Sequence, residues 1–237
     1  MYRHLDWEGC FNARDLGGLR TRDGRVTQFG RIMRADSLDG LTAAGWAALV
    51  ADGVRTIVDL RNDDEIGADV APRPVDVATV RVPLDVSDDR EFWSVWGSGP
   101  QFGTPLYYRP HLERFPERSA AAVAAIARAR QGAVAFHCSA GRDRSGQIAL
   151  LVLALAGVEP DEIATDYALS AVGLSARAAA LGQGDQGPML ESFLAERGTS
   201  AAALVAELVA DLDVEACLRG GGLSPGDVVA VRERLLG

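Results

Sequence analysis

The stretch Ala133-Val-Ala-Phe-His-Cys-Ser-Ala-Gly-Arg-Asp-Arg-Ser-Gly146 decides the fold. It opens with a short apolar run, Ala133–Phe136, which is typical of a buried strand when a Gly-containing turn precedes it. After a polar loop, the pattern predicts an apolar helix over Ser145–Ala156 that ends at Gly157. A buried strand that passes through a short loop into a helix is the repeating unit of α/β proteins.

Three more strands are predicted upstream of this stretch. They lie at Arg31–Arg34, Val54–Leu60 and Thr79–Leu84, and we expect the last two to be buried. Because these strands alternate with helical segments, we predict an α/β fold with a central, mainly parallel sheet flanked by helices. We see no repeat or low-complexity linker and therefore expect a single domain over residues 1–237.

Helix boundaries can be read from capping residues and prolines. Thr42 is predicted to cap a helix over Ala43–Ala51, and Ser119 to cap an Ala-rich helix that runs to Arg130. Pro160 suits the first position of another helix. The region of about 159–237 is expected to be helical, and its last helix starts at the capping sequence Ser224-Pro-Gly-Asp227.

Residues 91–118 differ from the rest of the chain in composition. A long connection rich in aromatic residues, Gly and Pro is typical of a lid or a binding loop. The alternative is a satellite core of packed rings beneath a loop, and the sequence favours neither. Seven of the 15 Phe, Trp and Tyr residues lie here: Phe92, Trp93, Trp96, Phe102, Tyr107, Tyr108 and Phe115.

The charge balance excludes some partners. The chain has 24 Lys+Arg against 33 Asp+Glu, which gives a formal net charge of −9. This balance argues against nucleic acid and against a stable membrane anchor, and no apolar run reaches the roughly 18 residues of a membrane span. Because charges occupy the first eight residues, where a secretion signal needs apolar ones, we expect a cytoplasmic protein, with signal-independent export left open.

The loop between the predicted strand and helix carries the chemistry. Cys138 and Arg144 stand six residues apart. A short loop that ends at a helix N-terminus points several main-chain N–H groups at one spot, and the helix dipole makes that spot attractive to a phosphate. Arg144 can bind two phosphate oxygens through its planar guanidinium, while the same field favours a nucleophilic thiolate at Cys138.

Two neighbours of this loop are expected to assist. Ser145 can donate its hydroxyl to the sulfur when the sulfur becomes the leaving group, and His137 is expected to orient the loop through hydrogen bonds to the main chain rather than to act as a base. The alternative is that Cys138 is a buried, inert cysteine. Cys10 and Cys217 have leucine six residues on and are predicted to be structural.

The loop and three further motifs resemble a known family. The motifs are Phe11-Asn-Ala-Arg-Asp-Leu-Gly-Gly18, Arg34-Ala-Asp-Ser37, and Val58-Asp-Leu-Arg61 with Glu65. Together with the loop, they are similar to the bacterial tyrosine/serine protein phosphatase family (PtpB-like) of the cysteine-dependent protein tyrosine phosphatase superfamily. The similarity runs from about residue 8 to the C-terminus. Where the family commonly has lysine in the loop, this chain has Arg142.

The resemblance implies an activity and a set of site residues. It implies metal-free hydrolysis of phosphate monoesters through a phosphocysteine, without a cofactor and with inorganic phosphate as product or bound ligand. Substrates would be phosphorylated proteins, foremost at tyrosine with dual specificity open, or phosphoinositides. The phosphate-binding loop would consist of Ser139, Ala140, Gly141, Arg142, Asp143 and Arg144.

Two aspartates compete for the role of general acid. Asp143 lies inside the loop, where the family places a catalytic aspartate, and we favour it. Asp85 follows the predicted strand Thr79–Leu84, at the position where related enzymes hold an acid on a separate loop. Asp59 and Arg61 follow a buried strand at the edge where α/β sheets hold their sites, and we expect them to brace the loop by ion pairing.

Three alternatives to a protein phosphatase remain at this point. A phosphoinositide phosphatase would use the two arginines of the loop, Arg142 and Arg144, to bind a polyphosphorylated head group. A sulfurtransferase also holds a cysteine in a cradle loop, but the cysteine-to-arginine spacing fits phosphate better. A non-catalytic phosphate-binding module is the alternative from another class, and the intact Cys138, Asp143 and Arg144 argue against it.

Overall fold

The computed structural model describes residues 3–237. Within these residues, five strands form one sheet in the order β1-β2-β5-β3-β4. Strand β1 is antiparallel to β2, and all other neighbours are parallel, which confirms the predicted α/β fold. The strands are β1 (Arg14–Asp15), β2 (Ile32–Ala35), β3 (Val54–Asp59), β4 (Ala78–Arg81) and β5 (Ala133–His137).

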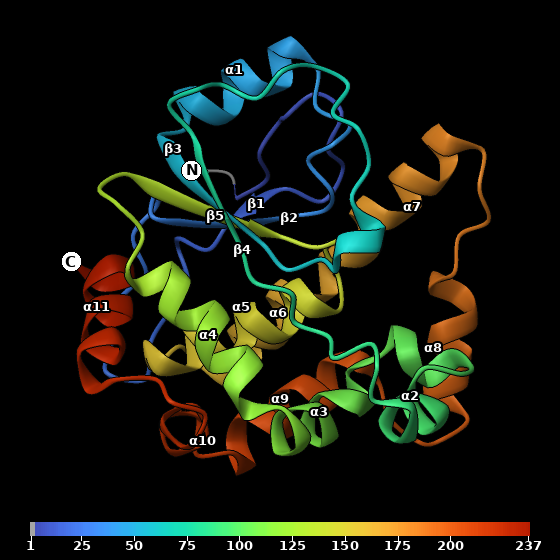
Figure 1. Cartoon of the computed structure of the whole chain (residues 1–237). Coiled ribbons are helices and arrows are strands. Elements are labelled where there is room, and N and C mark those ends of the chain that lie inside the picture. The colour runs from blue at the N-terminus through green and yellow to red at the C-terminus, as the bar shows by residue number, and fades with distance from the viewer. Residues whose placement is uncertain (1–2) are drawn as a thin grey trace.

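Helices cover both faces of the sheet (Figure 1). Helix α1 lies on one face, and α4 and α5 lie on the other, where α10 and α11 pack against α4 and α9 packs against α6. The α-helices are α1 (Ala43–Ala51), α2 (Arg90–Trp96), α3 (Tyr108–Arg114), α4 (Pro116–Ala127), α5 (Arg144–Leu155), α6 (Pro160–Ala168), α7 (Ser170–Leu181), α8 (Gly187–Ala195), α9 (Ala201–Asp211), α10 (Val214–Gly220) and α11 (Pro225–Leu236). Short 3₁₀ turns are η1 (Asp63–Glu65), η2 (Pro100–Gly103) and η3 (Pro105–Tyr107).

Strand β5 lies at the centre of the core because it pairs with a strand on each edge and is covered on both faces. Val134 and Phe136 belong to the cluster on the α5 side, and Ala133 and Ala135 belong to the cluster on the α1 side. Successive side chains of a strand point to opposite faces, so a strand buried on both sides must be apolar throughout. This explains why the run Ala133–Phe136 could be recognised as a buried strand.

Several capping predictions are confirmed. The Thr42 side chain accepts a hydrogen bond from the Gly45 amide at 3.1 Å and starts α1. The last helix begins with a capping box in which Ser224 and Asp227 bond each other's main-chain N–H groups. Such caps satisfy N–H groups that have no partner inside the helix, so the signal is local and can be read from sequence.

Two predictions about elements are wrong. The strand expected at Thr79–Leu84 is β4, Ala78–Arg81, and it is exposed along its length because it forms the edge of the sheet. The helix expected to start at Ser119 starts at Pro116, the N-terminal residue of α4. Ser119 lies in the first turn of that helix, fully buried, so it does not cap it.

The aromatic segment 91–118 is largely ordered as helix, not as one long loop. It contains most of α2, both 3₁₀ turns η2 and η3, helix α3 and the start of α4. Four of its rings are buried and belong to the main core: Phe92, Tyr107, Tyr108 and Phe115. Phe102 is the exposed exception at 41%. The segment therefore packs as an extension of the core, and its action as a lid stays a prediction.

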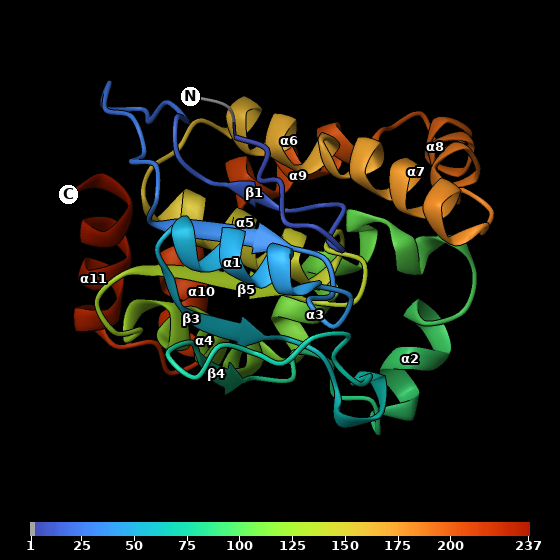
Figure 2. The same cartoon turned by 90° about the horizontal axis from the view of Figure 1, so that it is seen from above.

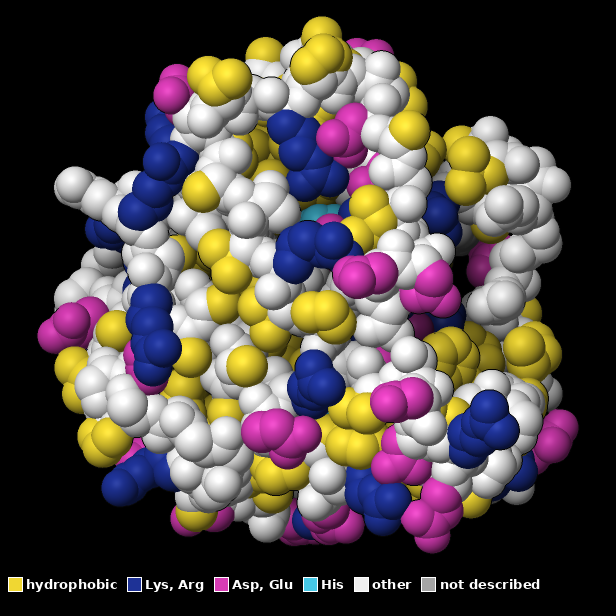
Figure 3. All heavy atoms as spheres, in the orientation of Figure 1, with side chains coloured by type: hydrophobic (Ala, Val, Ile, Leu, Met, Phe, Trp, Pro, Cys, Tyr) yellow, Lys and Arg dark blue, Asp and Glu magenta, His cyan; other side chains and the backbone are white. Residues whose placement is uncertain are grey.

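The carboxyl ends of the parallel strands define where a site can form. In Figure 2, β2 and β3 point toward the side of the molecule where α2, α7 and α8 lie. Acidic and basic side chains are interspersed on the face shown in Figure 3. Within residues 3–237, none of the helices combines the length and apolar character that a membrane crossing requires.

Candidate active site

The loop between β5 and α5 turns tightly against β2. Strand β5 ends at the buried His137, and α5 begins at Arg144. Gly141 has a φ of +71°, and a Cβ at this position would lie 2.6 Å from the Asp36 nitrogen. The loop therefore needs glycine here both for its left-handed conformation and for its close approach to the neighbouring backbone.

Cys138 lies inside the loop with its sulfur directed at hydrogen-bond donors. The residue is 2% exposed. The Gly141 amide donates to Sγ at 3.3 Å, and the Ser145 hydroxyl lies 3.7 Å from the same atom. An amide and a hydroxyl next to a sulfur stabilise negative charge on it, both in a nucleophilic thiolate and in a leaving thiolate.

The loop carbonyls are held by side chains from the start of the chain. The Asn12 amide donates to Ala140 O at 3.2 Å and to Gly141 O at 3.0 Å. Arg34 donates from Nη2 to Gly141 O at 2.8 Å. Because a peptide unit presents its C=O and N–H in opposite directions, fixing these carbonyls directs loop amides toward the opposite side.

A buried ion cluster fixes Arg34 in turn. Asp166 of α6 contacts Arg34 Nη1 at 2.8 Å and Arg14 Nε at 3.1 Å, and Arg3 joins the same carboxylate. Burial would raise the pKa of Asp166, but the surrounding guanidinium groups hold it well below its ordinary value. Sequence reasoning missed Arg34 and Asp166 as parts of the site, although Arg34 lies in a motif of the resemblance.

Two carboxylates hold Arg144. Glu65 accepts hydrogen bonds from both Nη groups, and Asp85 Oδ2 lies 3.4 Å from Nε. Burial would raise the pKa of Glu65, but the bonds from Arg144 lower it to about 2. Burial opposes the charge on Arg144, yet Glu65 raises the pKa of its guanidinium above the ordinary value. Arg144 is therefore a fixed cation beside Cys138.

The two candidate acids occupy different places. Asp143 lines the pocket that contains Cys138, and its carboxylate lies 3.1 Å from Arg142 Nε. Asp85 lies behind Arg144, where burial raises its pKa to about 6 although Arg144 opposes the shift. The nearby Asp89 accepts from the Phe92 amide and caps α2.

His137 and the pair Asp59–Arg61 support the loop from the β3 side. His137 Nδ1 lies 3.3 Å from Cys138 O, and burial lowers the pKa of its ring to about 4. Arg61 binds Asp59 at 2.9 Å and is 1% exposed. Among the described contacts the pair bonds no residue of 138–144. It reaches the loop through His137 and through Ser37, whose amide donates to Ser139 O at 3.1 Å.

The other two cysteines have different surroundings. Cys10 donates from Sγ to Asp36 at 2.6 Å, and burial, together with that carboxylate, raises the pKa of its thiol. Burial also raises the pKa of Cys217. Both thiols are thereby held in the neutral form, which is a poor nucleophile. Within residues 3–237, no three His, Cys, Asp or Glu side chains come together as metal ligands.

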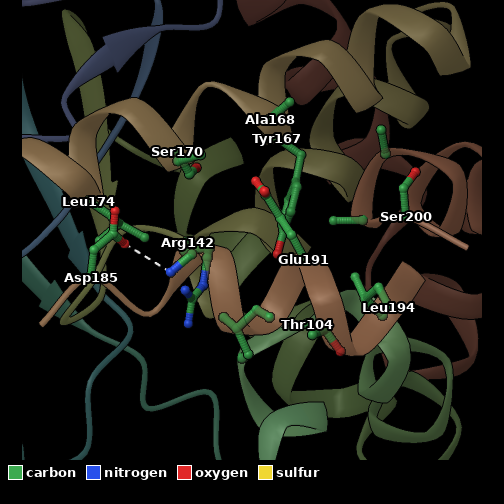
Figure 4. Close-up of a pocket in the computed structure, with 16 residues that line it drawn as sticks. Thr104, Arg142, Tyr167, Ala168, Ser170, Leu174, Asp185, Glu191, Leu194 and Ser200 are labelled. Atoms are coloured by element: carbon green, nitrogen blue, oxygen red, sulfur yellow. Dashed lines mark hydrogen bonds between the residues drawn. The ribbon is translucent and has the colours of Figure 1, made fainter. Parts of the chain in front are cut away.

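A pocket of about 520 Å³ opens over the loop. Cys138, Asp143 and Arg144 line it together with walls that include Phe102, Tyr107 and Met189. A second, mostly apolar pocket of about 280 Å³ lies beside it between α6, α7, α8 and α9 (Figure 4). Arg142 reaches into both and forms part of the wall between them.

The fold and loop geometry define a class of protein. In this class of α/β proteins, a cysteine, a loop amide and an arginine lie together at a helix N-terminus, as Cys138, the Gly141 amide and Arg144 do here. The chain belongs to the tyrosine phosphatase family, whose family profile matches residues 5–237. This confirms the family resemblance that the sequence motifs indicated.

Three bacterial relatives are similar to parts of this chain. A tyrosine-protein phosphatase of Nostoc commune is 36% identical over 148 residues, 59% of this chain and 48% of the relative. A candidate tyrosine-protein phosphatase of Cupriavidus necator is 34% identical over 175 residues, 70% of this chain and 62% of the relative. The triple specificity protein phosphatase PtpB of Mycobacterium tuberculosis is 29% identical over 189 residues, 67% of this chain and 66% of the relative. The matches therefore cover about half to two thirds of each relative's length.

Proposed function

We propose that this protein hydrolyses phosphate monoesters through a phosphocysteine on Cys138, with phosphotyrosine in proteins as its principal substrate. The observation that carries this proposal is that the Gly141 amide and the Ser145 hydroxyl lie at the Cys138 sulfur, while Arg144, fixed by Glu65, lines the same pocket. Such a site binds an oxyanion and stabilises a thiolate at the same place, and that combination is what cysteine-based phosphoryl transfer requires.

In the first step, the Cys138 thiolate attacks phosphorus in line with the leaving oxygen. The S–P bond forms as the P–O bond breaks, while loop amides and Arg144 stabilise the charge on the three equatorial oxygens. Asp143, which lines the pocket, donates a proton to the leaving oxygen.

In the second step, a water molecule attacks the phosphocysteine. Asp143, now a carboxylate, takes a proton from that water as the P–S bond breaks. The Ser145 hydroxyl donates to the departing sulfur, which lies 3.7 Å away. Inorganic phosphate leaves, and the Cys138 thiolate and the protonated Asp143 are regenerated. The two steps together consume one water molecule and need no cofactor.

The pocket walls and the relatives support the choice of substrate. The rings of Phe102 and Tyr107 line the pocket and can pack against the ring of a phosphotyrosine. Relatives carry the name tyrosine-protein phosphatase, and one is described as having triple specificity. Phosphoserine, phosphothreonine and phosphoinositides are therefore the competing substrates. We further propose a cytoplasmic location, where a reactive thiol stays reduced.

The decisive experiment compares the wild type with Cys138→Ser on phosphotyrosine peptides, phosphoserine peptides and phosphoinositides. We expect phosphate release and a vanadate-sensitive burst of aryl alcohol from an activated aryl phosphate in the wild type, and neither in the variant. Cys217→Ser serves as the matched control and should behave as the wild type. A wild type that binds phosphate but releases no alcohol would be a binding module, and the proposal would fail.

A further inference from the structure

His111 is a buried histidine that the proposed mechanism does not use. It lies on α3 with no exposed surface, among aromatic rings. The ring centroids of Phe92 and Phe115 are 5.9 and 5.3 Å away. Burial lowers the pKa of its ring to about 4, so the imidazole is neutral at physiological pH. A neutral histidine in an aromatic cluster must have a partner for each nitrogen or lose free energy.

A glutamine from α5 determines which nitrogen carries the proton. Gln147 Nε2 lies 3.1 Å from His111 Nδ1 and donates to Ser119 Oγ at 2.9 Å. Because an amide nitrogen only donates, this orientation of the Gln147 amide makes Nδ1 the acceptor and places the ring proton on Nε2. The buried chain Ser119–Gln147–His111 therefore presents one N–H at its end.

That N–H faces Asp85. His111 Nε2 lies 3.9 Å from Asp85 Oδ1, which is longer than a hydrogen bond, and the Leu84 backbone also faces the ring. Neither Nε2 nor Oδ1 has a hydrogen-bond partner of normal geometry among the described residues. The other carboxylate oxygen, Oδ2, lies 3.4 Å from Arg144 Nε. Asp85 is thus placed between a neutral donor from the core and the cation of the site, and it does not line the pocket that holds Cys138.

We propose that Asp85, oriented by His111, is an anchor for the Nε side of Arg144, and that both are positioning residues for oxyanion binding. A guanidinium has five N–H groups. Glu65 takes one from each Nη, Asp85 faces the one on Nε, and Ser139 Oγ lies 3.4 Å from Nη2. This leaves the second N–H on Nη1, and the Nη2 N–H that is only weakly shared with Ser139, for the oxygens of a bound oxyanion. The proposal rests on the proposed function only in that Arg144 binds phosphate.

The anchor should depend on pH. Asp85 is faced by Arg144 from α5, Glu65 from η1, Asp143 from the loop, Tyr107 from η3 and His111 from α3. Burial raises the pKa of Asp85 to about 6, whereas His111 stays neutral down to about 4. Asp85 is therefore mainly a charged carboxylate above pH 6 and mainly a neutral carboxyl group below it. Its ion pair with Arg144 weakens as the pH falls through 6.

The test measures binding of tungstate, a tetrahedral dianion, by calorimetry, which needs no turnover. At pH 7.5 we expect Asp85→Asn to weaken tungstate binding about tenfold, the size of one charge-assisted hydrogen bond. We expect His111→Phe to weaken it severalfold and His111→Gln, which keeps an N–H, to restore part of the loss. The double variant should be no weaker than Asp85→Asn alone. Between pH 7 and 5, where tungstate condenses but sulfate stays a tetrahedral dianion, the wild-type affinity for sulfate should fall toward that of Asp85→Asn.

Controls separate positioning from packing. Phe115→Leu loosens the same aromatic cluster without removing an N–H and should bind tungstate as the wild type does. Gln147→Leu frees the proton of His111 to move to Nδ1 and should weaken binding even if His111→Phe does not fold. Unchanged tungstate affinity in folded Asp85→Asn or His111→Phe overturns the anchor.

Kinetic measurements distinguish an anchor at Asp85 from a general acid at the same residue. An Asp85→Asn loss confined to alkyl phosphates, with activated aryl phosphates spared, would make Asp85 the general acid and would also overturn the anchor. A wild type that binds tungstate through Asp85 and His111 but hydrolyses no phosphate ester would refute the proposed function and leave the anchor standing.

Discussion

Asp143 and Asp85 are both carboxyl groups near Cys138, and their surroundings divide their roles. Asp143 is in the pocket, beside the cation of Arg142. Asp85 is behind Arg144, with one oxygen toward the core. A general acid must reach the leaving oxygen, so the position of Asp143 suits proton transfer and that of Asp85 suits support of Arg144.

Asp143→Asn should slow reactions in proportion to their need for a proton. We expect kcat on an alkyl phosphate to fall about 100-fold, a usual value for general acid catalysis. An activated aryl phosphate, whose leaving group departs as an anion, should lose less than about tenfold for the same reason. Steady-state kinetics on both substrates give the result, with the exposed Asp88→Asn as control. Equal losses on the two substrates would contradict the assignment.

Sequence reasoning could find Cys138 and Arg144, the residues proposed to contact phosphate, but it could not assign the particular contacts that support them. Cys138 and Arg144 share one loop, so their spacing and the following helix suffice. Asn12 and Arg34 support Gly141 O from 129 and 107 residues away, and His111 faces Asp85 from a different element. Such partners are set by the order of strands in the sheet, which no local pattern encodes.

At the scale of elements, the loop depends on the backbone of β2. A Cβ on Gly141 would lie 2.6 Å from Asp36 N and 2.8 Å from Ala35 C. These are main-chain atoms at the end of a buried strand, and displacing them would cost considerable free energy. The loop geometry that the active site needs is therefore bound to the contact between β5 and β2.

Gly141→Ala should damage activity more than stability alone explains. We expect kcat/KM to fall more than about tenfold, because the displaced amide no longer points at Cys138. Gly157→Ala is the matched control: it also has a positive φ, +76°, but no atom lies within 4 Å of its Cβ. This control should lose about 1 kcal/mol of stability and keep its kcat. Similar kinetics in the two variants would show that the close approach is dispensable.

Local signals predicted the elements whose ends depend on local bonds. Thr42 and Ser224 cap their helices as expected. The predicted start of α4 is wrong because Pro116, with its fixed φ, begins the helix without a side-chain cap. The predicted burial of β4 is wrong because apolar residues also occur on edge strands, and only the sheet order shows which strand is outermost.

At the scale of the whole molecule, buried titratable groups link stability to pH. His111 and His137 are fully buried, and burial lowers the pKa of each to about 4. In the unfolded chain a histidine takes up a proton near pH 6.5. Between these values the unfolded state binds more protons than the folded state, so stability falls as the pH falls. Asp85, whose folded pKa is raised to about 6, works in the opposite direction and offsets part of the loss.

The free energy of unfolding should therefore be lower at pH 4.5 than at pH 7, by about 3 kcal/mol from these three groups. His111→Phe removes one of the two histidines. The free energy of unfolding that this variant loses between pH 7 and pH 4.5 should therefore be less than half of what the wild type loses. Urea denaturation at several pH values measures both. A wild type that gains stability on acidification, or a variant with an unchanged slope, would refute this account.

Asn12 and Gly141 are in contact, but Gly141 is added to the growing chain 129 residues after Asn12. At usual rates of synthesis this gap lasts on the order of ten seconds. Throughout that interval the emerging N-terminal segment has no loop to bind, because the residues around Cys138 have not yet been translated. On the proposed function, a newly made chain therefore stays inactive toward phosphate esters until its oldest residues contact much younger ones.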